Sequence, residues 1–167
     1  MKYELSLIGI GIFALLFAFL LYQRLKKKSM GNVKMAELSL IIKEGAKSYL
    51  TKQYQILAVV AGIAAIILWI FLNIQTAIAF IIGAVLSSIA GISGMMVATS
   101  ANARTTEGCR KSLNEGLQIA FSSGVIVGMT IVGLGLVGVI VSYLIFQDLE
   151  ILFGFGFGAG LIALFAR

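Results

Sequence analysis

The chain has 167 residues, of which 60% are hydrophobic and 12% are charged, and its mean hydropathy is +1.05. Soluble domains average about 45–50% apolar and about 25% charged residues, so this composition excludes a soluble globular protein, and it is too apolar for a disordered one. Histidine is absent and cysteine occurs once, which excludes a disulfide framework and a Cys/His metal site. The net charge of +6 would indicate nucleic-acid binding in a soluble protein. Here it predicts basic connections at a membrane surface and no nucleic-acid partner.

Five apolar stretches follow one another along the chain. A helix that crosses a bilayer needs about 20 mostly apolar residues, and 19 glycines without any proline are typical of unbroken, closely packed membrane helices. We therefore predict an all-α, polytopic transmembrane helix bundle that forms a single membrane domain. Its five spans are expected at about 5–22, 56–72, 77–100, 117–146 and 151–167. The fifth stretch gives only about 24 Å of helix before Arg167, and a pattern that stops there predicts a fragment of a longer protein.

The basic residues gather in alternate connections. Eight lie within 23–55 and three within 101–116, whereas the connections at 73–76 and 147–150 contain none. The positive-inside rule places both basic connections in the cytoplasm, which puts the N-terminus outside and predicts a multi-pass protein of the cell membrane.

Part of the first basic connection has helical periodicity. Apolar residues recur at helical spacing from Met35 to Tyr49, with lysines and glutamates between them. Two interpretations stay open: a helix that leaves the membrane surface and continues into the second span, or an interfacial helix that lies on anionic lipid.

The recognisable motifs point to packing, not to chemistry. Gly133, Gly135 and Gly138 form GxGxxG, but inside a long apolar run and not between a strand and a helix, so we interpret them as packing residues. Small residues four apart predict close helix contacts; they include Gly124/Gly128, Gly154/Gly158, Gly156/Gly160 and the series Gly83, Ser87, Gly91. Cys109 lies near basic residues but has no histidine partner in the chain, so we expect no catalytic role for it. From these residues we predict no catalytic, cofactor or metal site.

Four stretches together resemble the membrane-integral inorganic pyrophosphatases, which are ion pumps. They are MAELSLIIKEGAKSYLTKQYQ at 35–55, GAVLSSIAGISGMMVATSANARTTEGCRKSLNEGLQIAF at 83–121, SGVIVGMTIVGLGLVG at 123–138 and GFGFGAGLIALFAR at 154–167. Their order and spacing match the family over nearly the whole chain after the first helix.

The resemblance implies a homodimer of sixteen-helix subunits, each with six inner helices ringed by ten outer ones. Such proteins hydrolyse pyrophosphate with Mg²⁺ at the cytoplasmic face and move H⁺ or Na⁺ outward; whether K⁺ is needed stays open. Spans one to four would be outer helices and the fifth the first inner helix. The family's aspartate-rich, magnesium-binding motif follows the FAR sequence, beyond residue 167, so we expect the chain alone to be inactive.

Arg167 is the one site residue that the resemblance assigns, as a gate on the ion path. On the sequence alone, an arginine that closes a span is an ordinary positive-inside anchor, so both interpretations are kept. The alternative to a pump is a complete, non-enzymatic five-helix membrane scaffold or transporter subunit.

Overall fold

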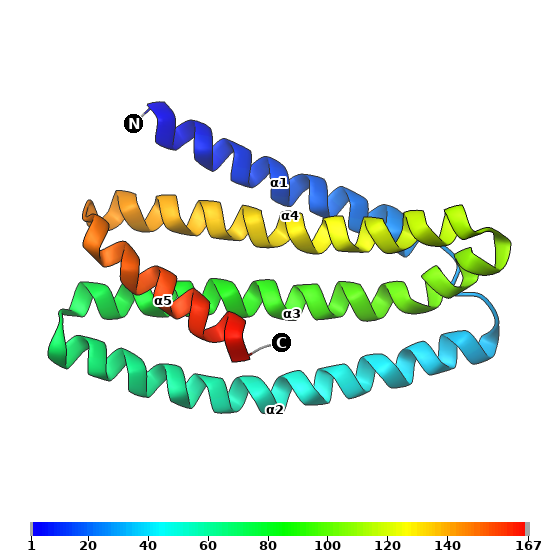
Figure 1. Ribbon diagram of the computed structural model, residues 1–167, viewed down its shortest axis with the longest axis horizontal. Helices are drawn as coiled ribbons and strands as arrows, with labels where there is room; N and C mark the ends of the chain where they lie inside the picture. The colour runs from blue at the N-terminus through cyan, green and yellow to red at the C-terminus, as the bar shows by residue number, and fades with distance from the viewer. Residues whose placement is uncertain (1, 166–167) are drawn as a thin grey trace.

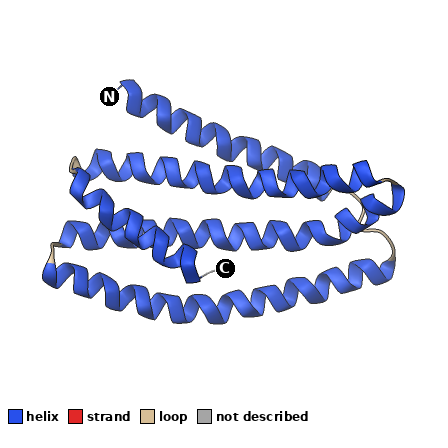
Figure 2. Ribbon diagram, in the orientation of Figure 1, coloured by secondary structure: helices blue, strands red, loops and turns tan. Residues whose placement is uncertain are grey.

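The computed structural model describes residues 2–165 and contains five α-helices joined by short connections (Figures 1 and 2). No strand occurs in this range, so the predicted all-α class is confirmed. The helices are α1 (Lys2–Lys26), α2 (Val33–Phe71), α3 (Ile74–Lys111), α4 (Leu113–Phe146) and α5 (Leu149–Phe165).

The four long helices run antiparallel in the order α1, α4, α3, α2, and α5 lies against α3 and ends partway along it (Figure 1). α3 is the centre of the bundle, because it packs against α4, α5 and α2, whereas α1 packs mainly against α4. This arrangement brings the α1–α2 and α3–α4 connections to one end and the α2–α3 and α4–α5 connections to the other. The two basic connections therefore share one end of the molecule, as the charge pattern predicts.

Capping residues define where the helices begin. The side-chain oxygens of Asn32, Asn73 and Ser112 each accept a hydrogen bond from the backbone N–H three residues later, at 2.9, 2.7 and 3.1 Å. Asp148 accepts from Glu150 N at 2.8 Å at the start of α5. Each cap satisfies a backbone donor that the first helical turn leaves without a partner. These polar caps explain how a chain without proline makes sharp reversals.

Three helices are longer than a bilayer is thick. α2, α3 and α4 have 39, 38 and 34 residues, or about 50–60 Å, against a hydrocarbon core of about 30 Å. With α1 they are the four helices in residues 2–165 that are long and apolar enough to cross a membrane, while α5, with 17 residues, is shorter.

The connections that we expected at 23–55 and 101–116 are mostly helical. α2 is one continuous helix from Val33, which favours the interpretation of a helix that continues into the second span over a separate interfacial helix. Only Ser112 separates α3 from α4. Hydropathy marks the membrane part of such a helix, whereas capping and packing decide its ends.

Glycines allow α5 to lie directly on the backbone of α3. A Cβ at Gly158 would clash with the Phe80 carbonyl, and a Cβ at Gly83 with that of Phe155. At Gly154 it would lie 2.6 Å from the Thr76 carbonyl oxygen. The predicted packing role of Gly83 and of the Gly154/Gly158 pair is therefore confirmed.

The GxGxxG glycines serve two different contacts of α4. A Cβ at Gly133 would lie 2.9 Å from the carbonyl oxygen of Gly11 on α1, and one at Gly138 would lie 2.9 Å from Cζ of Phe155 on α5. No atom lies within 4 Å of a Cβ placed at Gly135. All three lie inside one helix, which fits the packing interpretation and not a dinucleotide site. The other predicted glycine pairs make no such contact. A Cβ would meet no atom within 4 Å at Gly124, Gly128, Gly156 or Gly160.

Candidate functional site

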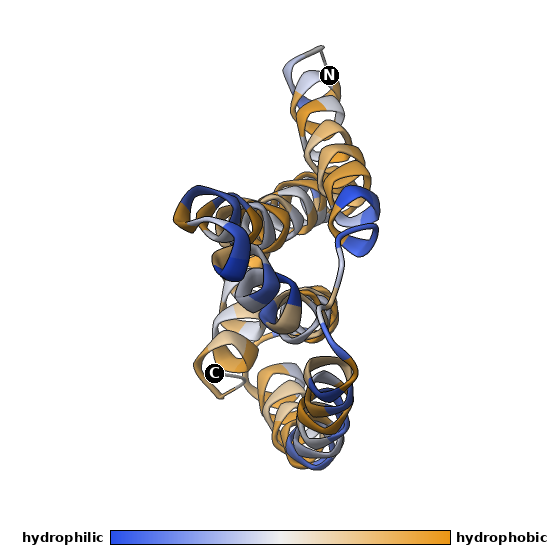
Figure 3. Cartoon of the chain, turned by 90° about the vertical axis from the view of Figure 1, so that its right-hand side faces the viewer, coloured by the Kyte–Doolittle hydropathy of each residue, from blue (hydrophilic) through white to orange (hydrophobic). Residues whose placement is uncertain are grey.

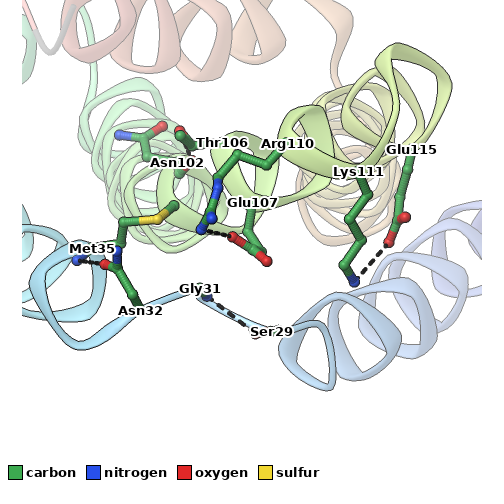
Figure 4. A network of polar contacts seen from close by, with 10 residues as sticks. All are labelled: Ser29, Gly31, Asn32, Met35, Asn102, Thr106, Glu107, Arg110, Lys111 and Glu115. Carbon is green, nitrogen blue, oxygen red and sulfur yellow. Dashed lines mark hydrogen bonds and ion pairs between the residues drawn. The ribbon is translucent and has the colours of Figure 1, made fainter.

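Polar side chains concentrate at the basic end of the bundle, where the α1–α2 connection passes the ends of α3 and α4. Figure 3 looks onto this end, with hydrophilic ribbon at the helix ends and mostly apolar ribbon behind it. Figure 4 shows ten residues of this network, which come from the α1–α2 connection, α2, α3 and α4. This polar network is the candidate site.

Arg104 on α3 binds the end of α1 through its guanidinium group. Its Nε donates to the Lys28 carbonyl at 3.1 Å and its Nη2 to the Lys26 carbonyl at 3.3 Å, while Nη1 donates to the Ser100 carbonyl of its own helix. The residue is 9% exposed. A helix C-terminus has unpaired carbonyls and a partial negative charge, so a cation there is stabilised without a carboxylate. Arg104 therefore fastens α1 to α3.

Glu107 and Gly31 form the next contact. Glu107 Oε2 accepts from Arg110 Nη1 at 3.0 Å, and the Glu107 side chain is 17% exposed. Gly31 has φ +85°, a left-handed conformation that glycine adopts readily, and a Cβ there would lie 2.9 Å from Glu107 Oε2. Both the left-handed backbone conformation and the close approach to Glu107 on α3 therefore favour glycine at position 31.

Glu115 links three elements at the start of α4. Its Oε1 lies 3.7 Å from Nζ of Lys111 on α3 and 4.0 Å from Nζ of Lys28 in the α1–α2 connection. The Glu115 backbone N–H also donates to the Ser112 cap. Ion pairs this exposed contribute little individually, on the order of 0–1 kcal/mol, so their role is to align the connections.

The structure brings no nucleophile and base together at this end. Cys109 is a free, exposed thiol beside the tight α3–α4 turn, and a Cβ at Gly116 would overlap its Sγ. Arg167, the predicted gate, lies outside the described residues. The nearest described feature is the end of α5, where the Phe165 carbonyl accepts a hydrogen bond from the Gln53 side chain of α2.

Arg104 was not predicted as a functional residue, because in the sequence it is one of eleven basic residues in the two basic connections. A signal was available in the spacing of its neighbours. Three buried residues lie at helical spacing from Arg104. They are Val97, seven positions before it, Ala101, three positions before it, and Gly108, four positions after it. An arginine on the buried face of a helix must find hydrogen-bond acceptors, here the carbonyls at the end of α1.

The described residues do not fit a magnesium site. Mg²⁺ needs oxygen ligands that converge, and no group of three acidic, cysteine or histidine side chains in residues 2–165 is close enough to hold a metal. Glu107 and Glu115 are paired with basic residues at one end, and Asp148 lies at the other. The basic end can therefore hold helices in register, but no metal-dependent step can be derived from it.

Antiparallel apolar helices with their charges at the ends define a multi-pass membrane protein. The model of one family, described as inorganic H⁺ pyrophosphatase, matches residues 12–167. The chain therefore belongs to the inorganic H⁺ pyrophosphatase family.

Relatives in several organisms are similar to nearly the whole chain. A Clostridium tetani protein, provisionally named a K⁺-stimulated pyrophosphate-energized sodium pump, is 48% identical over 158 residues. The K⁺-insensitive pyrophosphate-energized proton pump of Methanosarcina mazei is 36% identical over 159 residues. Each match covers 94% of this chain and 24% of the relative. The K⁺-stimulated pyrophosphate-energized sodium pump of Thermotoga maritima is 39% identical over 139 residues, which are 82% of this chain and 19% of that protein.

The chain thus spans about a quarter of the length of the curated relatives it matches. Their names describe both sodium and proton pumps, and both K⁺-stimulated and K⁺-insensitive ones.

Proposed function

We propose that this chain is the amino-terminal part of a membrane-bound pump that couples hydrolysis of magnesium pyrophosphate to outward transport of H⁺ or Na⁺. The observation that carries the proposal is the family match over residues 12–167, which includes every described helix from the middle of α1 onward. The similarity to both sodium and proton pumps supports the reaction and leaves the transported ion open.

Within such a pump, α1–α4 act as part of an outer framework. Every acidic residue of the chain lies near a helix end or in a polar extension, with none at the centre of an apolar stretch. A helix that carries ions needs polar groups inside the membrane, where they are rare and functional. Backbone-to-backbone packing at glycines, as between α3 and α5, supports a rigid framework on which other helices are built.

The finer parts of the proposal come from the family resemblance. The resemblance implies that Mg²⁺ is bound with pyrophosphate by acidic residues outside this chain. The names of some relatives state that they are K⁺-stimulated and those of others that they are K⁺-insensitive, and this chain is compatible with both. The full-length protein is a homodimer in the bilayer, and the exposed apolar side chains along the helices support extensive contact with lipid or with further helices.

Arg167 is proposed as the gate residue on the ion path. The Phe165 carbonyl accepts a hydrogen bond from the Gln53 side chain, so the last described turn of α5 lies against α2. An arginine on an inward face of a membrane helix needs carboxylate partners, because an unpaired charge there is unfavourable.

The proposal is tested by comparing the chain with the protein made from its whole reading frame. The purified 1–167 chain should release no phosphate from magnesium pyrophosphate above background, because its acidic residues do not converge. Membranes that contain the product of the whole reading frame should release phosphate in a Mg²⁺-dependent manner. Specific phosphate release by the purified chain would contradict the assigned role of the chain. No release by the whole product would favour the alternative, a non-enzymatic membrane scaffold or transporter subunit.

A further inference from the structure

A cleft lies between α1 and α4 at the basic end. The inference drawn from it does not depend on the proposed pump reaction. Its volume is about 230 Å³. Leu25 and Ile119, both 4% exposed, form its apolar floor together with Leu21. Its rim is polar, with Arg24 and Lys28 on the side of α1 and Glu115, Gln118 and Ser122 on the side of α4. A small apolar floor under a cationic rim is an amphipathic site.

The cleft lies where the membrane interface is expected. On α1 the apolar stretch ends at Tyr22, and the Lys26 ammonium lies 5.3 Å from the centroid of the Tyr22 ring. Tyrosine rings and lysines flanking a span are typical of the headgroup region. On α4 the Ser122 hydroxyl donates to the Gln118 carbonyl at 2.6 Å, close to where the apolar stretch begins. The cleft therefore lies near the boundary between the apolar stretches and the basic connections.

Some charged groups of the rim have partners of opposite charge and others do not. Glu115 interacts with Lys111 at 3.7 Å and with Lys28 at 4.0 Å, so its negative charge is balanced by lysines. Within residues 2–165 the Arg24 guanidinium makes no ion pair or hydrogen bond, although it lines the cleft. The rim thus has a net positive charge and a planar group whose donors match a phosphate or carboxylate.

We propose that this cleft binds the headgroup of an anionic phospholipid, with the phosphate against Arg24 and Lys28. The upper part of the acyl chains would lie on Leu21, Leu25 and Ile119. Basic pockets between membrane helices on the cytoplasmic side are a known type of site for anionic lipid headgroups. A free phosphate would use the rim but not the apolar floor, which is why a lipid is the better match.

The test measures lipid binding to the detergent-purified product of the whole reading frame by native mass spectrometry. Phosphatidylglycerol and phosphatidylcholine with identical acyl chains are titrated against the wild type and three variants. Arg24→Gln removes the unpaired cation, and Ser122→Phe fills the cleft while keeping every charge. Lys43→Gln removes the same charge from exposed α2, which lies on the far side of α3 (Figure 1), and serves as the matched control. Circular dichroism checks that each variant is as helical as the wild type.

We expect one phosphatidylglycerol to bind more tightly than phosphatidylcholine. Arg24→Gln should weaken phosphatidylglycerol binding about fivefold, the effect of one interfacial basic residue, and Lys43→Gln should change it less than about twofold. Ser122→Phe should also weaken it, which separates a shaped site from general charge attraction. Equal binding of both lipids, or equal effects of Arg24→Gln and Lys43→Gln, would overturn the proposal. Displacement of the bound lipid by inorganic phosphate would show that the rim is an anion site without lipid specificity and would overturn it as well.

Discussion

Arg104 shows how a buried charge can be stabilised by backbone alone. Its three donors go to the carbonyls of Lys26, Lys28 and Ser100, so the cation is neutralised by the dipole at the end of α1 and not by an acid. Because two of these acceptors lie 76 and 78 residues away in the chain, the contact fixes where α1 ends relative to α3. A charge that would be unfavourable in an apolar setting thereby becomes a link between two helices.

Arg104→Ala should destabilise the chain by about 2–3 kcal/mol, because hydrogen bonds to a charged group are lost and the acceptor carbonyls stay unpaired. Arg104→Lys should recover part of this, since an ammonium cannot reproduce the planar fork. Arg110→Ala is the matched control, because its side chain is 60% exposed and its one ion pair with Glu107 is at the surface. The measurement is thermal unfolding in detergent followed by circular dichroism. Equal losses in both alanine variants would contradict the capping role.

Arg167→Ala in the full-length protein should uncouple or strongly depress ion pumping, and Arg167→Lys should restore it only in part. The reason is that a gate needs the guanidinium fork on the ion path, whereas an anchor needs only a positive charge near the headgroups. Hydrolysis and ion uptake are measured together in inverted vesicles. Full hydrolysis with full uptake in Arg167→Ala would return this residue to the role of a membrane anchor.

At the level of helices, sequence spacing predicts close packing but not which face makes it. Two pairs of glycines four residues apart alternate along α5, namely Gly154/Gly158 and Gly156/Gly160. They look equivalent in the sequence, yet only the first pair contacts α3. Residues two apart lie on nearly opposite sides of a helix, so the choice depends on where the partner helix lies. The spans predicted from hydropathy are shorter than the helices for a related reason. The polar ends of α2 and α3 are held by caps and by the Arg104 contact, which hydropathy does not detect.

Gly158→Leu should separate α5 from α3 and destabilise the chain by at least about 1–3 kcal/mol, since the new side chain would overlap the backbone at Phe80. Gly156→Leu should leave the stability close to that of the wild type, because a Cβ there meets no atom within 4 Å. Both variants place the same residue in the same helix, so propensity cancels. Thermal unfolding in detergent compares them. A larger loss in Gly156→Leu would show that α5 presents its other face to the bundle.

For the whole molecule, the alternation of apolar stretches and basic connections predicts the all-α bundle and the common end of the two basic connections. The polar network at that end could not be predicted, because Arg104 meets Lys26 and Lys28 only after α1 and α3 are placed side by side. The sequence also predicts that no catalytic site can be assembled from these residues. The family match supplies what composition and spacing do not, namely the family to which the chain belongs, and the proposed reaction is based on it.

The orientation of the bundle can be read from its single thiol. Cys109 is exposed at the basic end, which the positive-inside rule places in the cytoplasm. A membrane-impermeant maleimide should therefore spare Cys109 in intact cells and label it in inside-out vesicles. Denatured samples control for accessibility. Labelling in sealed, intact cells would reverse the assigned topology and place the N-terminus inside.

We propose that this chain belongs to a pump driven by pyrophosphate. Inside-out vesicles that contain the product of its whole reading frame provide the direct test, with uptake of H⁺ followed by a pH-sensitive dye and uptake of Na⁺ by a radioisotope. We predict that magnesium pyrophosphate drives uptake of one or both ions, and that an ionophore for the transported ion abolishes the gradient while hydrolysis continues. If magnesium pyrophosphate drives no uptake of H⁺ or Na⁺, with or without K⁺, the result contradicts this proposal.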